Sequence, residues 1–152
     1  MKKYVTRIAA LFLAFGLSLG MTIPAYAADS SGGDVSPQAS DYISSYAAWA
    51  GAGSGGKVYI YYDIDATGYV ARVGAKLIVV QVLDAGVWTN VKTITGTTSN
   101  GMLLSNAAAH TGNIVYQGTA GNSYRAVVTV YAGPVSGGDS RIVTTNSVTA
   151  KS

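Results

Sequence analysis

The sequence predicts an all-β fold, a sandwich of about seven antiparallel strands built from one domain. Three observations lead to this prediction. β-branched residues and Tyr dominate from residue 42 onward, Gly and Asn separate the apolar segments, and no window keeps a helical period. Short strands divided by turn residues favour two packed antiparallel sheets over a barrel or a parallel sheet.

Residues 1–27 have the order of a secretory signal peptide, which we expect to be helical until it is removed. Three basic residues among the first seven precede an uncharged apolar stretch at 8–23, and Ala25-Tyr26-Ala27 supplies a small-x-small cleavage site. Gly, Ser and Pro interrupt the apolar stretch, which argues against an uncleaved membrane anchor. We therefore expect cleavage after Ala27, a secreted protein and no stable membrane anchor.

Cleavage would change the charge balance. The net charge is +3 for the whole chain, but residues 28–152 hold four Lys, three Arg and seven Asp, and are formally neutral. A basic surface for nucleic acid is therefore not expected. The chain has no Cys, so neither a disulfide nor a thiolate metal site can form, and one buried core must hold the domain together.

Residues 28–40 are small and polar, which is typical of a disordered leader, and 41–152 form the predicted domain. Within it we expect strands over 43–50, 58–64, 77–83, 88–94, 114–117, 123–132 and 141–148. The second of these gives the clearest pattern, because Val58, Ile60, Tyr62 and Ile64 alternate with polar or Tyr positions. That alternation predicts one inward row and one Tyr-rich outward row.

A loop with Gly121-Asn122 leads into Tyr124, which begins the alternating row of Ala126, Val128 and Val130. Immunoglobulin-like and fibronectin type III-like sandwiches place a "tyrosine corner" at this point, with the phenol bonded to upstream backbone. Tyr124 is the candidate for that structural role, and an ordinary core tyrosine is the alternative.

The segment from Lys57 to Ala150, with KVYIYYDIDATG, VGAKLIVVQ, GVWTNVKTI, GTAGNSYRAVVTVYAG and SGGDSRIVTTNSV, resembles a family of uncharacterised small secreted proteins of Gram-positive bacteria. The resemblance implies the same Ig-like or fibronectin-like sandwich. Its motifs are turns, core strands and a Trp, so it implies no catalytic residue.

Several patterns could carry chemistry, and each also has a structural interpretation. The residue spacing of Gly51 to Lys57 (GAGSGGK) matches a nucleotide-binding loop, but a strand rather than a helix is expected after it, which favours a flexible connection.

Asp63 and Asp65, with Asp139, form a weak Ca²⁺ candidate, and solvated strand-end carboxylates are the alternative. A hydrolase using these carboxylates would need a cleft that nothing in the sequence marks. His110 is the single histidine, and we expect it in a loop.

Tyr59, Tyr61 and Tyr131 are the candidate binding residues, because each alternates with a predicted inward row and rigid aromatic rings favour binding surfaces. Ordinary outward strand tyrosines are the alternative. Trp88 is expected at the edge of the core, with Trp49 packed on it or on a neighbour. Apolar side chains also fill the row opposite the predicted inward row, at Leu77, Val79, Leu83 and Val127, so a partner or a second copy could cover that face.

These patterns predict a secreted interaction module without catalytic residues or cofactor, whose partner is a protein or a cell-wall glycan. A self-assembling structural exported protein, which forms a homo-oligomer through an apolar sheet face, is the first alternative. A metal-assisted or carboxylate-based hydrolase is the second. Fold analogy alone supports the first prediction, since such sandwiches host many functions.

Overall fold

The computed structural model describes residues 40–152, and this part of the chain consists of strands and the turns that join them. The predicted signal peptide, its cleavage after Ala27 and the predicted leader up to residue 39 lie outside the described residues. The strands are β1 (Ile43–Ala52), β2 (Lys57–Val70), β3 (Arg72–Asp84), β4 (Val87–Thr95), β5 (Leu103–Leu104), β6 (Ala107–Gln117), β7 (Ser123–Gly133), β8 (Asp139–Thr144) and β9 (Val148–Thr149).

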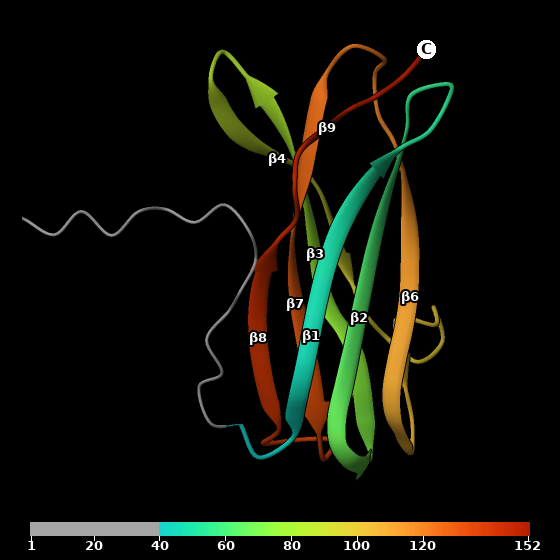
Figure 1. The fold of residues 1–152 in the computed structure, drawn as a ribbon, viewed down its shortest axis with the longest axis vertical. Coiled ribbons are helices and arrows are strands. Elements are labelled where there is room, and N and C mark those ends of the chain that lie inside the picture. The colour runs from blue at the N-terminus through green and yellow to red at the C-terminus, as the bar shows by residue number, and fades with distance from the viewer. Residues whose placement is uncertain (1–39) are drawn as a thin grey trace, which may run out of the picture. The chain divides into compact units, whose positions relative to one another are not determined.

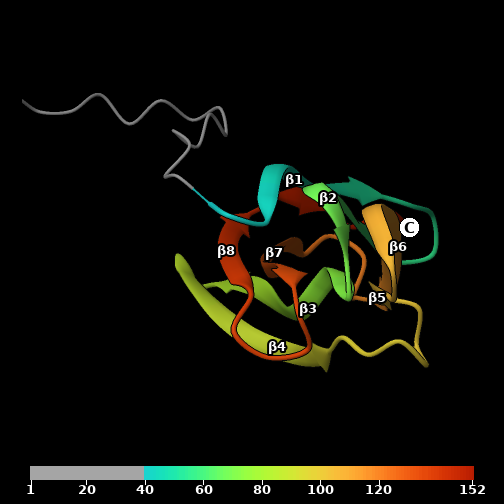
Figure 2. The same ribbon diagram turned by 90° about the horizontal axis from the view of Figure 1, so that it is seen from below.

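All strand pairs are antiparallel, and they form two sheets. The smaller sheet has the order β1-β2-β6, and the larger has β4-β3-β7-β8, with β5 beside β3 and β9 beside β7. The chain crosses between the layers after β2 and again on each side of β6 (Figures 1 and 2). This is a β-sandwich, as the sequence predicts.

The core lies between the two sheets and is made by the predicted inward rows. Val58, Ile60 and Ile64 of β2 are fully buried, and Tyr62 is 1% exposed. Across the core, Ala126, Val128 and Val130 of β7 are fully buried as well. Their alternation with less buried neighbours confirms the two-residue period predicted for both strands.

Several strand boundaries differ from the prediction. β2 continues to Val70 and β3 begins at Arg72, so both strands are longer than predicted, and the two-residue strand β5 was not predicted. The predicted short strand at 114–117 is an eleven-residue strand, β6, because Ala107 to Asn113 pair with β2 despite their low β-propensity. The predicted last strand at 141–148 is divided between β8 and β9. The division is at Thr145, whose Oγ1 accepts a hydrogen bond from the Ala126 N–H and donates one to the Asn146 carbonyl.

Tyr124 has the predicted corner geometry. Its phenolic oxygen accepts a hydrogen bond of 2.9 Å from the backbone N–H of Thr119, five residues upstream. The ring passes against Gly118, where an added Cβ would lie 2.7 Å from it. Tyr124 is 3% exposed, so the bond ties the loop before β7 to the core.

Within residues 40–152 no helix is long and apolar enough to cross a membrane.

Candidate functional site

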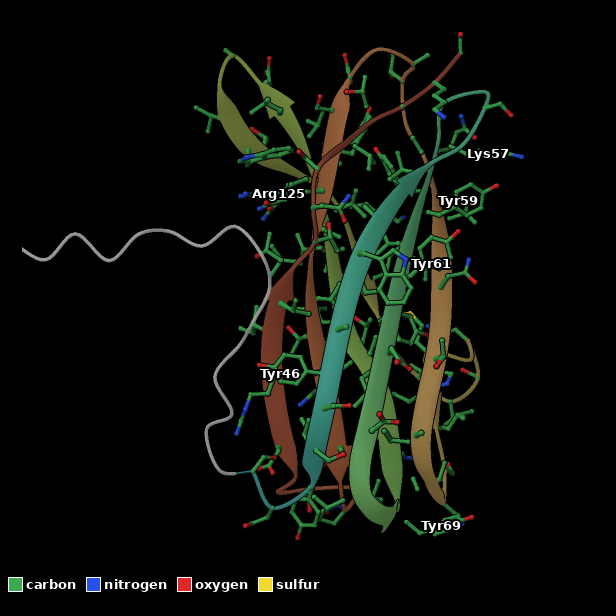
Figure 3. All side chains as sticks on the ribbon, in the orientation of Figure 1. Tyr46, Lys57, Tyr59, Tyr61, Tyr69 and Arg125 are labelled. Carbon is green, nitrogen blue, oxygen red and sulfur yellow. The ribbon has the colours of Figure 1, made fainter. Side chains whose placement is uncertain are left out.

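Three aromatic side chains form a row on the outer face of the β1–β2–β6 sheet. Trp49 of β1 lies opposite Tyr61 of β2, and their ring centroids are 5.5 Å apart with planes 13° from parallel. Tyr59, two residues before Tyr61, continues the row at 6.2 Å and 18°. Figure 3 shows both tyrosines on this side of the molecule. Trp49 is 44% exposed, and the two tyrosines are half-buried. We call these three residues the aromatic row.

Two glycines of the first hairpin leave the space that the tyrosine rings occupy. A Cβ added to Gly53 would lie 2.5 Å from Cε2 of Tyr59, and one added to Gly51 would lie 3.4 Å from Cε2 of Tyr61. The rings therefore lie over Gly51 near the end of β1 and over Gly53 just after it, where no side chain fills the space. Only residues 53–56 of the glycine-rich segment connect the two strands, because Gly51 belongs to β1 and Lys57 to β2. Gly51 and Gly53 also make room for the aromatic row.

Polar side chains continue the same face beyond Tyr61. Asp63 and Asp65 share this face of β2, as the two-residue spacing predicts. Asp63 Oδ1 accepts a 2.5 Å hydrogen bond from Thr111 Oγ1 of β6, and Asp65 Oδ2 accepts one of 2.7 Å from Ser45 Oγ of β1. Lys57 is on the same strand at the opposite end of the row (Figure 3). The face thus offers aromatic rings at its centre and carboxylates beside them.

Tyr131 does not belong to this face, and the expectation that its ring is exposed is wrong. Its side chain is 6% exposed. The turn after β7 folds back over it, so that the phenol donates a hydrogen bond to the Pro134 carbonyl and accepts one of 3.1 Å from the Gly138 N–H. The Nζ of Lys76 lies 5.2 Å from the ring centroid. Tyr131 therefore stabilises the turn, because both hydrogen bonds of its hydroxyl are satisfied locally.

The weak Ca²⁺ candidate is not assembled. Asp139 accepts hydrogen bonds from Ser40 Oγ and the Tyr42 N–H at the start of β8, whereas Asp63 and Asp65 are bonded to Thr111 and Ser45. Among residues 40–152 no group of three or more His, Cys, Asp or Glu side chains could hold a metal ion. Alternation along one strand placed two of these carboxylates together, but the third belongs to the other sheet.

His110 lies within β6 and not in a loop, because the strand is longer than predicted. Its ring meets Tyr62 edge to face at 5.4 Å, and Nε2 lies 2.8 Å from the carbonyl oxygen of Gly101. That nitrogen therefore carries the proton. The histidine links β6 to the turn before β5, which is a structural role.

No protein-family model matches the sequence, and no curated protein matches it. Among solved structures, the chain is similar to a family 76 glycoside hydrolase from a bovine Bacteroides thetaiotaomicron strain, with 16% identity and a TM-score of 0.35. The alignment covers 69% of this chain and 20% of the other, so the chain spans about one fifth of that protein. So weak a likeness supports no inference about activity. The resemblance to secreted Gram-positive proteins stays a prediction.

The two tryptophans have different roles, and the sequence alone did not distinguish them. Trp49 packs on a neighbour, Tyr61, which was one of the two expected partners, and so it belongs to the candidate site. The expectation that Trp88 packs at the edge of the core is wrong. Trp88 is half-buried on the outer face of the larger sheet, opposite Leu83, and the guanidinium carbon of Arg125 lies 4.4 Å from the centroid of its ring. The sequence did hold a signal for the role of Trp49. Trp49 and Gly51 are two residues apart on one strand, so they share a face, and the glycine leaves space beside the indole for another aromatic ring.

Proposed function

We propose that this chain is an exported, non-catalytic module that binds a glycan through the outer face of the β1–β2–β6 sheet. The observation that carries the proposal is the aromatic row, with three near-parallel rings on adjacent strands. A pyranose ring presents a flat array of C–H bonds, and their partial positive charge complements the negative face of an aromatic ring. Successive rings along the row would take successive sugar units.

The polar flank favours a glycan over a protein as the partner. Asp is depleted at the centre of protein interfaces, yet Asp63 and Asp65 adjoin the aromatic row. Each carboxylate accepts one hydrogen bond from a neighbouring hydroxyl and retains further acceptor capacity for sugar hydroxyls. Two negative charges on this face also disfavour an acidic polysaccharide. The expected ligand is therefore a neutral or amino-bearing chain of pyranose units.

Binding to insoluble polysaccharides tests the proposal. The purified protein is incubated with cellulose, chitin and peptidoglycan, and the bound fraction is measured after sedimentation. Trp49→Ala and Tyr61→Ala should abolish retention on the polysaccharide that the wild type binds. Tyr69→Ala removes an aromatic ring that is 86% exposed at the far end of β2 and should retain full binding. Equal retention of the wild type and both aromatic-row variants would contradict the proposal.

A glycine pair gives a second test that leaves all three rings in place. Gly53→Ala inserts a Cβ 2.5 Å from the Tyr59 ring, which must swing away from its position in the row. Gly68→Ala is the matched control, because an added Cβ there meets no atom within 4 Å. The first variant should bind more weakly with its fold retained, and the second should bind like the wild type.

Self-association is a second candidate, supported by the other sheet. Leu77, Val79 and Val127 lie on its outer face and are half-buried, and Ile142 of β8 is 66% exposed on the same side. Assembly through this face predicts a mass that rises with protein concentration in sedimentation velocity experiments. A constant monomer mass at high concentration would exclude it.

A further inference from the structure

Arg125 is held in a fixed position on the outer face of the larger sheet. It lies opposite Gln81 of β3, which lies opposite Asn90 of β4, so the three side chains cross three strands in one line. Arg125 Nε donates a 2.8 Å hydrogen bond to Gln81 Oε1, and Gln81 Nε2 donates one of 2.8 Å to Asn90 Oδ1. Trp88 covers one face of the guanidinium at 4.4 Å. Figure 3 shows Arg125 near β4 and β7, away from the aromatic row.

These contacts use only part of the hydrogen-bonding capacity of the guanidinium. Arginine has five N–H donors, and the single donor on Nε is the one that bonds Gln81. Within residues 40–152 the two terminal nitrogens of Arg125 have no hydrogen-bond or ion-pair partner. Their four donors form a fork whose orientation is set by the Trp88 ring and by Gln81. A fork that is already ordered loses little entropy when it binds an anion.

No carboxylate pairs with Arg125 within the described residues, and Asp84, at the end of β3, alternates to the other side of the strand from Gln81 and Leu83. The outward rows of β3, β4, β7 and β8 contain no Asp among the described residues, whereas the outer face of the smaller sheet carries Asp63 and Asp65. Apolar side chains border the site on the hairpin of β3 and β4. Leu83, 40% exposed, lies opposite Trp88. This part of the outer face therefore combines the oriented guanidinium of Arg125 with the apolar side chains of Leu83 and Trp88, which a ligand could contact.

We propose that Arg125 forms an anion-binding site for an organic carboxylate. The terminal nitrogens donate two parallel hydrogen bonds to the carboxylate oxygens, and the carbon part of the ligand packs on Leu83 and the exposed edge of Trp88. Planar carboxylates match the guanidinium fork in this way. The site lies on the sheet opposite the aromatic row, so it takes a different ligand from the proposed glycan and does not depend on glycan binding.

The test uses benzoate as the probe and benzamide as its neutral analogue of the same shape. The indole N–H resonance of Trp88 is followed by ¹H–¹⁵N NMR during titration of the full-length protein. Benzoate should shift this resonance to saturation, whereas benzamide should not. Arg125→Lys keeps the positive charge but loses the fork, so benzoate should bind about tenfold more weakly to it. Arg72→Lys, the same substitution at an arginine that bonds Ser105, should bind like the wild type.

Three outcomes would overturn the proposal. They are equal affinity of benzoate for the wild type and Arg125→Lys, an equal response to benzamide, and tighter binding of inorganic phosphate than of benzoate. Gln81→Ala provides a second variant if Arg125→Lys proves unstable. It keeps the arginine but removes the acceptor that orients it, and so it should weaken benzoate binding while the Trp88 resonance remains.

Discussion

The side chain of Asn146 forms two hydrogen bonds with the backbone of Ala50. Asn146 Oδ1 accepts a 2.9 Å bond from the Ala50 N–H, and Nδ2 donates a 3.1 Å bond to the Ala50 carbonyl. Ala50 lies on β1, an edge strand of the smaller sheet, and Asn146 follows β8 of the larger one. The amide thus takes the place that a neighbouring strand would occupy, and it ties the two sheets together at the edge.

Asn146→Ala should destabilise the fold. The backbone N–H and carbonyl of Ala50, a residue that is 6% exposed, would lose their partners. We expect a loss of about 1–3 kcal/mol in the free energy of unfolding, measured by urea denaturation. Asn122→Ala, on the exposed turn before β7, is the control and should change it by less than about 0.5 kcal/mol. Similar losses in the two variants would mean that the Asn146 bonds contribute nothing specific.

Gly112→Ala should be destabilising because Tyr62 cannot move out of the way. An added Cβ would lie 2.3 Å from the Tyr62 hydroxyl oxygen and 2.5 Å from Cζ, and the ring is 1% exposed between the sheets. Overpacking of this kind costs about 1–3 kcal/mol. Thermal unfolding should show a lower Tm for this variant, while Gly68→Ala should match or slightly exceed the wild type. An unchanged Tm for Gly112→Ala would refute the expected clash.

Tyr124→Phe removes only the hydroxyl that binds Thr119. The backbone N–H of Thr119 then loses its partner, and we expect a loss of about 0.5–1.5 kcal/mol in unfolding free energy. Tyr69→Phe is the same change on a ring that is 86% exposed, and its effect should be below about 0.5 kcal/mol. Chemical denaturation of both variants measures the difference. Equal effects would show that the corner hydrogen bond is not stabilising.

Asp139 should make stability depend on pH in acid. Hydrogen bonds from Ser40 Oγ and the Tyr42 N–H lower the pKa of this carboxyl below its ordinary value. Because the folded-state pKa is the lower one, the carboxylate stabilises the fold above the ordinary Asp pKa, and that contribution is lost as pH falls below about 4.

The Tm of Asp139→Asn should therefore decline less steeply than that of the wild type as pH falls below about 4. Ser40→Ala, which removes the largest cause of the lowered pKa, should give an intermediate slope. Parallel profiles for all three proteins would contradict this assignment.

Much of the sandwich could be predicted because it depends on local alternation. The inward rows from Val58 and from Ala126, the outward position of Tyr59 and Tyr61, and the corner at Tyr124 all follow from a two-residue period next to turn residues. Prediction from local sequence failed where pairing with a neighbouring strand outweighed the low β-propensity of the residues themselves. Ala107 to Asn113 form strand because β2 offers them a partner, and His110 is in that strand for the same reason.

The sequence by itself determined the inward rows of β2 and β7, and hence the fold class and two of the three proposed binding residues. The tertiary structure alone decided which side chains meet. Trp49 stacks on Tyr61 through the register of β1 and β2, and Tyr131 is covered by a turn that follows it. Alternation fixes only the face of a residue, whereas its neighbours depend on strand register and on how each loop returns across the sheet.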